Sequence, residues 1–171
     1  MSVSSVKKNG QFFDVVTAGG TLNAKTVILA TGAKHRELGV PGEKELKGHG
    51  VSYCATCDGP FFKGKKILVC GGGDSAIQEA MYLTKLSDNV TVCHRRDRFR
   101  AQQAVVDNLK ATGKASFKMS HKVVSINAKD GKVGSVTFDD GQKQYTEDFD
   151  AVFVFVGFIP QSQLVPMCEK D

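Results

Sequence analysis

The sequence predicts an α/β protein whose main domain has a parallel sheet with an antiparallel β insertion, next to the remnant of a second domain. Three observations support this prediction. A strand, a glycine-rich turn, a helix and another strand follow one another over residues 66–93, about the length of a βαβ unit. Short β-branched and aromatic runs separated by Asp-Gly pairs come later, as in antiparallel hairpins. Residues 1–38 contain a hairpin and an apolar run that cannot bury both faces alone.

Composition and charge are those of a globular chain with a packed core. The 171 residues are 41% hydrophobic and 24% charged. The net charge of +5 is concentrated in residues 94–100, where one bound phosphate accounts for it, so we expect no nucleic-acid partner. No stretch approaches the roughly 20 apolar residues that cross a bilayer, and no signal peptide is recognisable. We therefore expect a cytoplasmic protein with no membrane partner.

The N-terminal region predicts a hairpin followed by a buried strand. Residues 12–18 are rich in aromatic and β-branched side chains, and residues 26–30 form a second apolar run. Residues 33–50 are polar, broken by glycine and proline, and without a period, which predicts a connector between domains. The predicted domains are the remnant at 1–38, the main domain at 39–160, and the start of a return segment at 161–171.

Two helices and the strands beside them follow in order. A strand over residues 65–70 precedes a helix that we expect to run to Leu86, and a second strand covers residues 90–93. Residues 101–112 predict another helix, ended by glycine. We expect its inward face to carry Ala104, Val105 and Leu109.

The C-terminal third predicts strands only. We assign residues 117–119, 123–126 and 133–138 to the antiparallel insertion because Asp-Gly turns separate or follow them. Residues 151–156 are apolar at every position, as in a central parallel strand.

The glycine-rich turn predicts a nucleotide site and makes the main domain Rossmann-like. Gly71 and Gly73, with Ala76 in the third position, form a variant of the GxGxxG fingerprint. The glycines let backbone N–H groups approach a pyrophosphate at the start of a helix, where Asp74 or Ser75 is the expected cap. A tight turn without a ligand is the alternative.

Arginines at the end of the second strand favour NADPH over NADH. An acidic residue there would bind the ribose 2′-hydroxyl, whereas arginine accommodates a 2′-phosphate. This chain has His94, Arg95 and Arg96, with Arg100 in the next turn. The guanidinium fork binds phosphate oxygens in pairs and stays charged. A solvated basic face is the alternative interpretation.

The pair Cys54 and Cys57 predicts a redox dithiol, with zinc binding and incidental buried thiols as alternatives. Zinc needs four ligands, and Cys70 and Cys93 lie within predicted strands, so no second pair is evident. A CxxC thiol attacks as the thiolate when its pKa is lowered. Asp58 follows directly and is placed either to exchange a proton with the dithiol or to serve as a simple turn residue.

The combined motifs resemble those of bacterial-type, low-molecular-weight thioredoxin reductases. Cys-Ala-Thr-Cys-Asp-Gly, Gly-Gly-Gly-Asp-Ser-Ala and His-Arg-Arg-Asp-Arg-Phe-Arg occur in that family's order and spacing. The resemblance implies a homodimeric flavoenzyme that passes electrons from NADPH through FAD to the dithiol and on to thioredoxin. Flavin also answers a chemical need, because nicotinamide delivers a hydride and a disulfide does not accept one directly.

The resemblance also implies a role for each matching residue. Cys54 and Cys57 are the redox pair and Asp58 the acid. Thr31 and Gly32 are minor FAD contacts. The implied NADPH residues are Gly71, Gly73, Asp74, Ser75, Ala76, His94, Arg95, Arg96, Arg100 and Gly157, the last at the start of a segment similar to the family's return crossing to the FAD domain.

The family's FAD fingerprint and flavin-binding C-terminal segment have no counterpart in the sequence. We therefore expect a fragment that binds NADPH but neither holds FAD nor turns over. The alternatives are a flavoprotein disulfide reductase that serves a peroxiredoxin, a pure NADP-binding module with incidental cysteines, and a zinc-stabilised scaffold.

Overall fold

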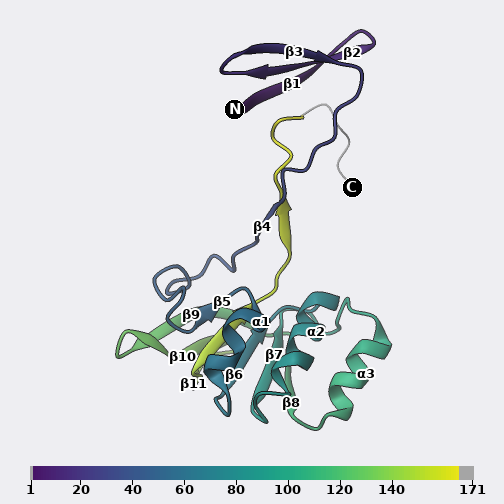
Figure 1. The fold of residues 1–171 in the computed structure, drawn as a ribbon. Coiled ribbons are helices and arrows are strands. Elements are labelled where there is room, and N and C mark those ends of the chain that lie inside the picture. The colour runs from purple at the N-terminus through teal and green to yellow at the C-terminus, as the bar shows by residue number, and fades with distance from the viewer. Residues whose placement is uncertain (1, 166–171) are drawn as a thin grey trace. The chain divides into compact units, whose positions relative to one another are not determined.

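A computed structural model describes residues 2–165, which fall into two units (Figure 1). The first unit contains the chain up to Lys34 together with the segment from Phe158 onward, and the second is His35–Gly157. Residues 35–38, which the sequence places in the first domain, thus group with the second unit. The predicted return segment is described only as far as Val165. No helix between residues 2 and 165 is long and apolar enough to span a membrane.

The first unit contains an antiparallel sheet in the order β1-β2-β3. Its strands are β1 (Val3–Asn9), β2 (Phe12–Thr17) and β3 (Gly20–Ala24). The hairpin of β2 and β3 confirms the prediction, whereas β1 was not predicted. Two short strands, β4 (Ala33–His35) and β13 (Phe158–Pro160), form a separate pair, so the predicted connector begins with a strand.

The predicted buried strand over residues 26–30 is wrong. This segment is irregular, and the Ile28 side chain is 93% exposed. No strand in the described sheets pairs with it. An apolar run becomes a strand only when a neighbour takes up its backbone hydrogen bonds. The hydrophobic pattern alone therefore did not determine its structure.

The second unit is built on a five-stranded parallel sheet in the order β5-β12-β6-β7-β8. The strands are β5 (Val51–Ser52), β12 (Ala151–Val154), β6 (Ile67–Cys70), β7 (Val90–His94) and β8 (Ala115–Met119). The predicted βαβ unit and the predicted central strand are confirmed. Residues 117–119 were assigned wrongly: they lie in β8, because α3 returns the chain to the parallel sheet as a second crossover.

The helices of the second unit are short. They are α1 (Ala55–Asp58), the 3-10 helix η1 (Gly59–Phe62), α2 (Asp74–Leu83) and α3 (Gln103–Ala111). The α2 helix thus ends three residues before the predicted Leu86. In α3, Val106 and Leu109 are buried, whereas Ala104 is exposed, so its predicted inward position was wrong.

The antiparallel insertion has the strand order β11-β10-β9. Its strands are β9 (Lys122–Lys129), β10 (Lys132–Asp139) and β11 (Gln144–Asp148), the last of which was not predicted. The turn between β9 and β10 places Asp130 and Gly131 at positive φ, as a tight hairpin requires.

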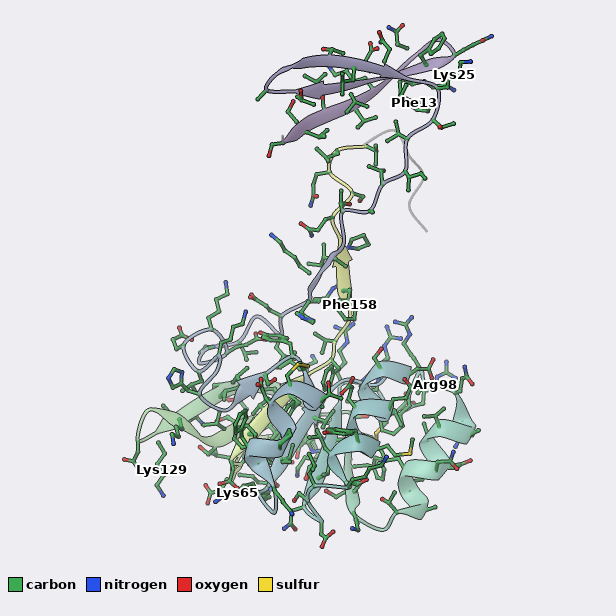
Figure 2. All side chains as sticks on the ribbon, in the orientation of Figure 1. Phe13, Lys25, Lys65, Arg98, Lys129 and Phe158 are labelled. Carbon is green, nitrogen blue, oxygen red and sulfur yellow. A yellow bond between two sulfur atoms is a disulfide. The ribbon has the colours of Figure 1, made fainter. Side chains whose placement is uncertain are left out.

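Two hydrophobic clusters cover opposite faces of the parallel sheet. Ile67 and Val69 of β6 join the cluster that includes α2 and α3, whereas Leu68 and Cys70 join the cluster that includes the insertion. Since the strands are parallel, the ends of β5, β6 and β7 share one edge, which we call the carboxyl edge. Figure 2 shows Arg98 at this edge of the unit and Lys65 at the opposite edge.

Candidate functional site

The dithiol turn, residues 52–58, leaves the sheet at the end of β5. Cys54 caps the N-terminus of α1 and is bonded to Cys57 in a disulfide. The Cys57 N–H donates to the Cys54 sulfur at 3.2 Å. Cys57 is exposed and Cys54 is half-buried, so the pair is open to reagents from solvent on the Cys57 side. Because the two sulfurs are joined, neither is a thiolate ligand for zinc in this form.

A buried serine holds the dithiol turn together. The Ser52 hydroxyl donates to Oδ2 of Asp58 at 2.6 Å and accepts from the Cys54 N–H at 3.1 Å. The sequence did not single out Ser52. The available signal was a polar residue at the end of a buried strand, two positions before the CxxC motif.

A buried carboxylate supports the turn from the side of residues 38–43. Glu43 is only 1% exposed, and its oxygens accept from the N–H groups of Leu38 and Gly39 at 2.9 and 2.7 Å. The Tyr53 hydroxyl also donates to it, at 2.9 Å. Burial and this hydrogen bond to Glu43 raise the pKa of Tyr53 well above its ordinary value. Tyr53 directly precedes Cys54, so Glu43 ties the incoming segment to the dithiol turn.

The glycine loop, Gly71–Gly73, follows β6. The space where a Cβ atom would lie differs at each of its three glycines. Gly71 has a φ of +152°, and a Cβ there would lie 2.4 Å from the Phe155 carbonyl oxygen. A Cβ on Gly72 would lie 2.4 Å from Nδ1 of His94. Gly73 faces open space. The first two glycines therefore serve internal packing, while the third leaves room for a ligand.

Backbone hydrogen bonds tie the glycine loop to the start of α3. The Gly72 carbonyl accepts from the N–H groups of Arg100 and Ala101 at 2.7 and 3.1 Å. Oδ1 of Asp74 accepts from the N–H of Gln102 at 2.8 Å. At least one oxygen of Asp74 thus has an internal role, whereas the neighbouring Ser75 is exposed. The first N–H groups of α2 lack partners within the helix and lie beside Gly73.

A basic cluster of Arg95, Arg96, Arg98 and Arg100 follows β7. All four side chains are exposed, and none forms an ion pair with another residue in the described part of the chain. The sequence had not assigned a role to Arg98. The cluster follows the strand next to β6, so four cations without carboxylate partners occupy the same edge as the glycine loop.

His94 lies under the glycine loop. Its ring contacts Gly72 and stacks on Phe99 with 5.8 Å between centroids. Nε2 is buried and has no hydrogen-bond partner among the described residues. Burial, together with the charges of Arg96, Arg95 and Arg100, lowers the pKa of His94. The ring therefore favours its neutral form and supports the loop by packing.

The whole chain, residues 1–171, matches the family model described as pyridine nucleotide-disulphide oxidoreductase. The chain belongs to this family. It is 43% identical to a thioredoxin reductase of Treponema pallidum, over 99% of this chain and 55% of the relative. It is 46% identical to one of Bacillus subtilis, over 91% of this chain and 50% of the relative. These similarities confirm the resemblance drawn from the three motifs.

Solved structures agree with the sequence relatives. Lactococcus lactis thioredoxin reductase in its FR conformation is similar with a TM-score of 0.86 and 38% identity, over 96% of this chain and 55% of that one. The thioredoxin reductase of T. acidophilum is similar with a TM-score of 0.83 and 36% identity, over 95% of this chain and 54% of that one. The chain thus spans about half the length of the curated relatives it matches.

Two further thiols are buried in adjacent strands. Cys70 and Cys93 are paired in register at the ends of β6 and β7. Burial raises the pKa of Cys93 to about 12 and that of Cys70 well above its ordinary value. Both thiols therefore stay protonated, in agreement with their prediction as core residues.

Three predicted cofactor contacts take part in internal hydrogen bonds. In the first unit, the Thr31 hydroxyl donates to the Gln161 carbonyl and the Gly32 carbonyl accepts from the Gln161 N–H. In the second unit, the Gly157 carbonyl accepts from the Arg36 N–H at 2.9 Å. Their assignment as FAD and NADPH contacts stays a prediction.

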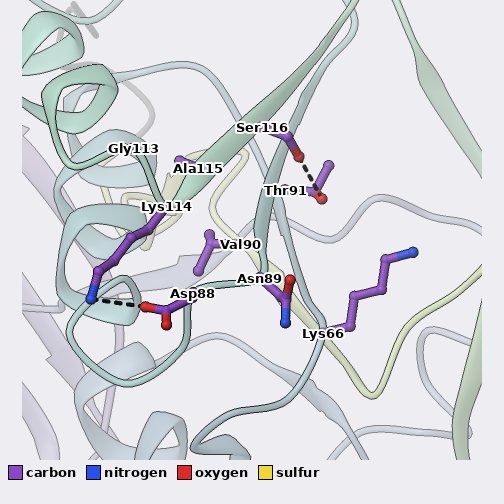
Figure 3. A pocket seen from close by; sticks show the side chains of 9 residues that line it. All are labelled: Lys66, Asp88, Asn89, Val90, Thr91, Gly113, Lys114, Ala115 and Ser116. Atoms are coloured by element: carbon purple, nitrogen blue, oxygen red, sulfur yellow. Dashed lines mark hydrogen bonds and ion pairs between the residues drawn. The ribbon is translucent and has the colours of Figure 1, made fainter.

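A pocket of about 250 Å³ lies at the opposite edge of the sheet, away from these motifs (Figure 3). Its lining includes Lys66, Asn89 and Lys114, which precede β6, β7 and β8. Lys114 pairs with Asp88 at 2.8 Å. In open parallel sheets ligands bind beyond the carboxyl ends of the strands. We therefore assign the candidate site to the carboxyl edge, where the dithiol turn, the glycine loop and the basic cluster all lie.

Proposed function

We propose that this chain carries the NADPH-binding and dithiol parts of a cytoplasmic thioredoxin reductase, in which electrons pass from NADPH through FAD to Cys54–Cys57 and on to thioredoxin. One observation carries the proposal. A reducible disulfide, an open glycine loop and a cluster of arginines follow strands that end at one edge of a single sheet, and within residues 2–165 these arginines have no ion-pair partner. The names of the relatives supply the substrate.

The carboxyl edge fits a phosphorylated dinucleotide. Gly73 has open space where a Cβ would lie, and the N–H groups of Gly73 to Ala76 can meet a pyrophosphate at the start of α2. Arg95, Arg96 and Arg100 would hold the 2′-phosphate. When bound, NADPH supplies a hydride. The described residues bind and orient it, and the neutral His94 ring keeps Gly72 in place.

The dithiol turn fits exchange with a protein disulfide. Once reduced, the exposed Cys57 thiolate attacks a substrate disulfide, forms a mixed disulfide and releases one substrate thiolate. Cys54 then attacks the Cys57 sulfur, which restores the Cys54–Cys57 bond and releases the second substrate thiolate. Asp58 exchanges protons with the two sulfurs as they change charge.

FAD and the homodimer belong to the proposal at the level of the full-length relatives. The single glycine fingerprint in the sequence is the loop that we assign to NADPH. Thr31 and Gly32 form hydrogen bonds with Gln161 and supply no reacting group to the chemistry above.

The proposal is tested by replacing Arg95 and Arg96 with alanine and titrating the chain with NADPH and NADH. Each lost charge-assisted hydrogen bond weakens binding by about 1.5–3 kcal/mol, or roughly 10- to 100-fold. We expect this loss for NADPH and almost none for NADH, which lacks the 2′-phosphate. Lys85→Ala, which removes an exposed cation just beyond the C-terminal end of α2, is the control. Equal losses for both nucleotides would contradict the assignment.

A further inference from the structure

We propose that Ser52 is a positioning residue of the dithiol chemistry. Its buried hydroxyl forms hydrogen bonds with both the Asp58 carboxylate and the Cys54 backbone N–H, and so fixes the position of the carboxylate relative to the disulfide. The inference deepens the proposed function and rests on it. It adds to Cys54, Cys57 and Asp58 a residue that touches neither sulfur through its side chain.

The position of Ser52 in the sheet makes its hydroxyl rigid. It is the last residue of β5, pairs in register with Phe153 of β12, and is 4% exposed. The neighbouring Val51 is also buried. A buried hydroxyl is unfavourable unless its hydrogen bonds are made, so a serine here needs partners. The dithiol turn supplies them.

The side-chain hydrogen bonds of Ser52 within the described residues go to Cys54 and Asp58 of the dithiol turn. Its oxygen accepts from the Cys54 N–H at 3.1 Å, and it lies 2.6 Å from Oδ2 of Asp58 and 3.3 Å from the Cys54 carbonyl oxygen. A hydroxyl has a single proton to donate, and the shorter, charged acceptor takes it. An apolar side chain of the same size could make neither bond.

This arrangement selects the oxygen of Asp58 that exchanges protons. Because Oδ2 accepts from Ser52, Oδ1 remains for the dithiol. When an external thiolate attacks the exposed Cys57 sulfur, the sulfur–sulfur bond breaks and a mixed disulfide forms. Cys54 leaves as a thiolate. Oδ1 of the Asp58 carboxylate takes up a proton from solvent and passes it to this thiolate, so Asp58 ends the step ionised as it began. A second external thiolate then releases Cys57. Without Ser52, the carboxylate would be free to rotate toward solvent.

The test follows reduction of the Cys54–Cys57 disulfide in this chain by excess dithiothreitol, with alkylation and mass analysis of the peptide that carries both cysteines. We expect Ser52→Ala to slow reduction about 10-fold, since orientation of the carboxyl group is lost. Asp58→Asn should slow it at least as much. The double variant should be no slower than Asp58→Asn alone, because Ser52 acts through Asp58.

A matched pair separates the hydroxyl from the shape of the side chain. Ser52→Thr and Ser52→Val add the same extra bulk to β5 and differ only in the hydroxyl. We expect the disulfide of the threonine variant to be reduced about 10-fold faster than that of the valine variant, because valine cannot orient the Asp58 carboxylate. This pair decides the question even if Ser52→Ala does not fold.

Two results would overturn the inference. Equal rates for the threonine and valine variants would show that the hydroxyl does not matter. A double variant whose rate loss is the product of the two single losses would show that Ser52 acts independently of Asp58. NADPH titration of the same variants keeps the proposed function separate: absence of nucleotide binding in the unmodified chain would refute that function, while the exchange rates would still judge Ser52.

Discussion

The dithiol turn and the glycine loop both follow strands at the carboxyl edge of one sheet, yet they are held in opposite ways. The dithiol turn depends on side chains that make hydrogen bonds, with Ser52 on one side and Glu43 on the other. The glycine loop depends on side chains that are missing, because neighbouring atoms occupy the space where Cβ atoms of Gly71 and Gly72 would lie.

The difference shows which kind of site each segment can be. In the dithiol turn, Ser52, Tyr53 and Cys54 make hydrogen bonds within the protein. Such a fixed segment suits a reacting group that stays covalently attached to the chain. The glycine loop presents open space at Gly73, beside helix N–H groups without intrahelical partners and exposed arginines. Such a segment is suited to hold a ligand that comes and goes.

The strongest way to break the comparison is to add side chains to the glycine loop. Gly71→Ala should destabilise the chain by about 3 kcal/mol, because overpacking adds to an unfavourable φ. Gly73→Ala should leave the free energy of unfolding within about 0.5 kcal/mol of the original, since a surface change that meets no atom has little effect. Urea unfolding measures both.

Nucleotide titration completes this pair. Gly73→Ala should weaken NADPH binding at least 10-fold, because the methyl group fills the space of the ligand. Unchanged affinity would mean that the open space at Gly73 is not where the nucleotide binds.

Removing the buried carboxylate tests the support of the dithiol turn. Glu43→Ala leaves two backbone N–H groups and the Tyr53 hydroxyl without their acceptor, and we expect a loss of about 2–3 kcal/mol in urea unfolding. Glu45→Ala, at a nearby exposed position, is the control and should have almost no effect. If Glu43→Ala lowers the free energy of unfolding only slightly, the hydrogen bonds to Glu43 do not hold the dithiol turn in place, and the contrast with the glycine loop fails.

A smaller change tests the tie between the glycine loop and α3. Asp74→Ala removes the acceptor of the Gln102 N–H, and we expect a loss of about 1 kcal/mol in urea unfolding. Asp74→Asn keeps an oxygen at this place and should recover most of the stability. If the two variants are equally destabilised, the oxygen of Asp74 does not brace the loop.

The smallest expected effect is the dependence of stability on pH at His94. Burial and the nearby charges of Arg96, Arg95 and Arg100 lower its pKa below the ordinary 6.5, so the unfolded chain binds more protons than the folded chain as pH falls. The neutral His94 ring contributes to the free energy of unfolding in full above pH 6.5, and this contribution is lost as pH falls toward the pKa of His94 in the folded chain. Between about pH 7.5 and about pH 5.5, the midpoint temperature of thermal unfolding should fall less for His94→Gln than for the original chain. An equal fall for both would show that His94 does not cause the loss of stability at low pH.

The sequence predicted the parts of the structure that depend on residues close together in the chain. The βαβ unit follows from a strand, a glycine turn and a helical period within 30 residues, and the disulfide pair follows from its spacing. Residues 26–30 are as apolar as the strands of the βαβ unit, but they are irregular in the structure. An apolar pattern does not specify whether a neighbouring strand is present to pair with. The β8 strand was placed in the wrong sheet because partner choice also depends on distant segments.

The supporting residues of the site depend on contacts across the fold. Glu43 looks like any charged residue in a polar connector until Leu38, Gly39 and Tyr53 converge on it. Ser52 looks like an ordinary strand end until α1 folds back toward it. The predicted cap of α2 at Asp74 or Ser75 was wrong, because the N-cap is Gly73 and no side chain caps the helix. One oxygen of Asp74, which was also expected to contact a nucleotide, turns to α3 instead.

The buried position of Cys70 and Cys93 has a consequence for sulfur chemistry in this chain. Because their thiols hold their protons far above neutral pH, they are poor nucleophiles toward a disulfide. Exchange of either buried sulfur into the Cys54–Cys57 bond is thereby suppressed, so neither Cys70 nor Cys93 displaces a partner of the surface couple.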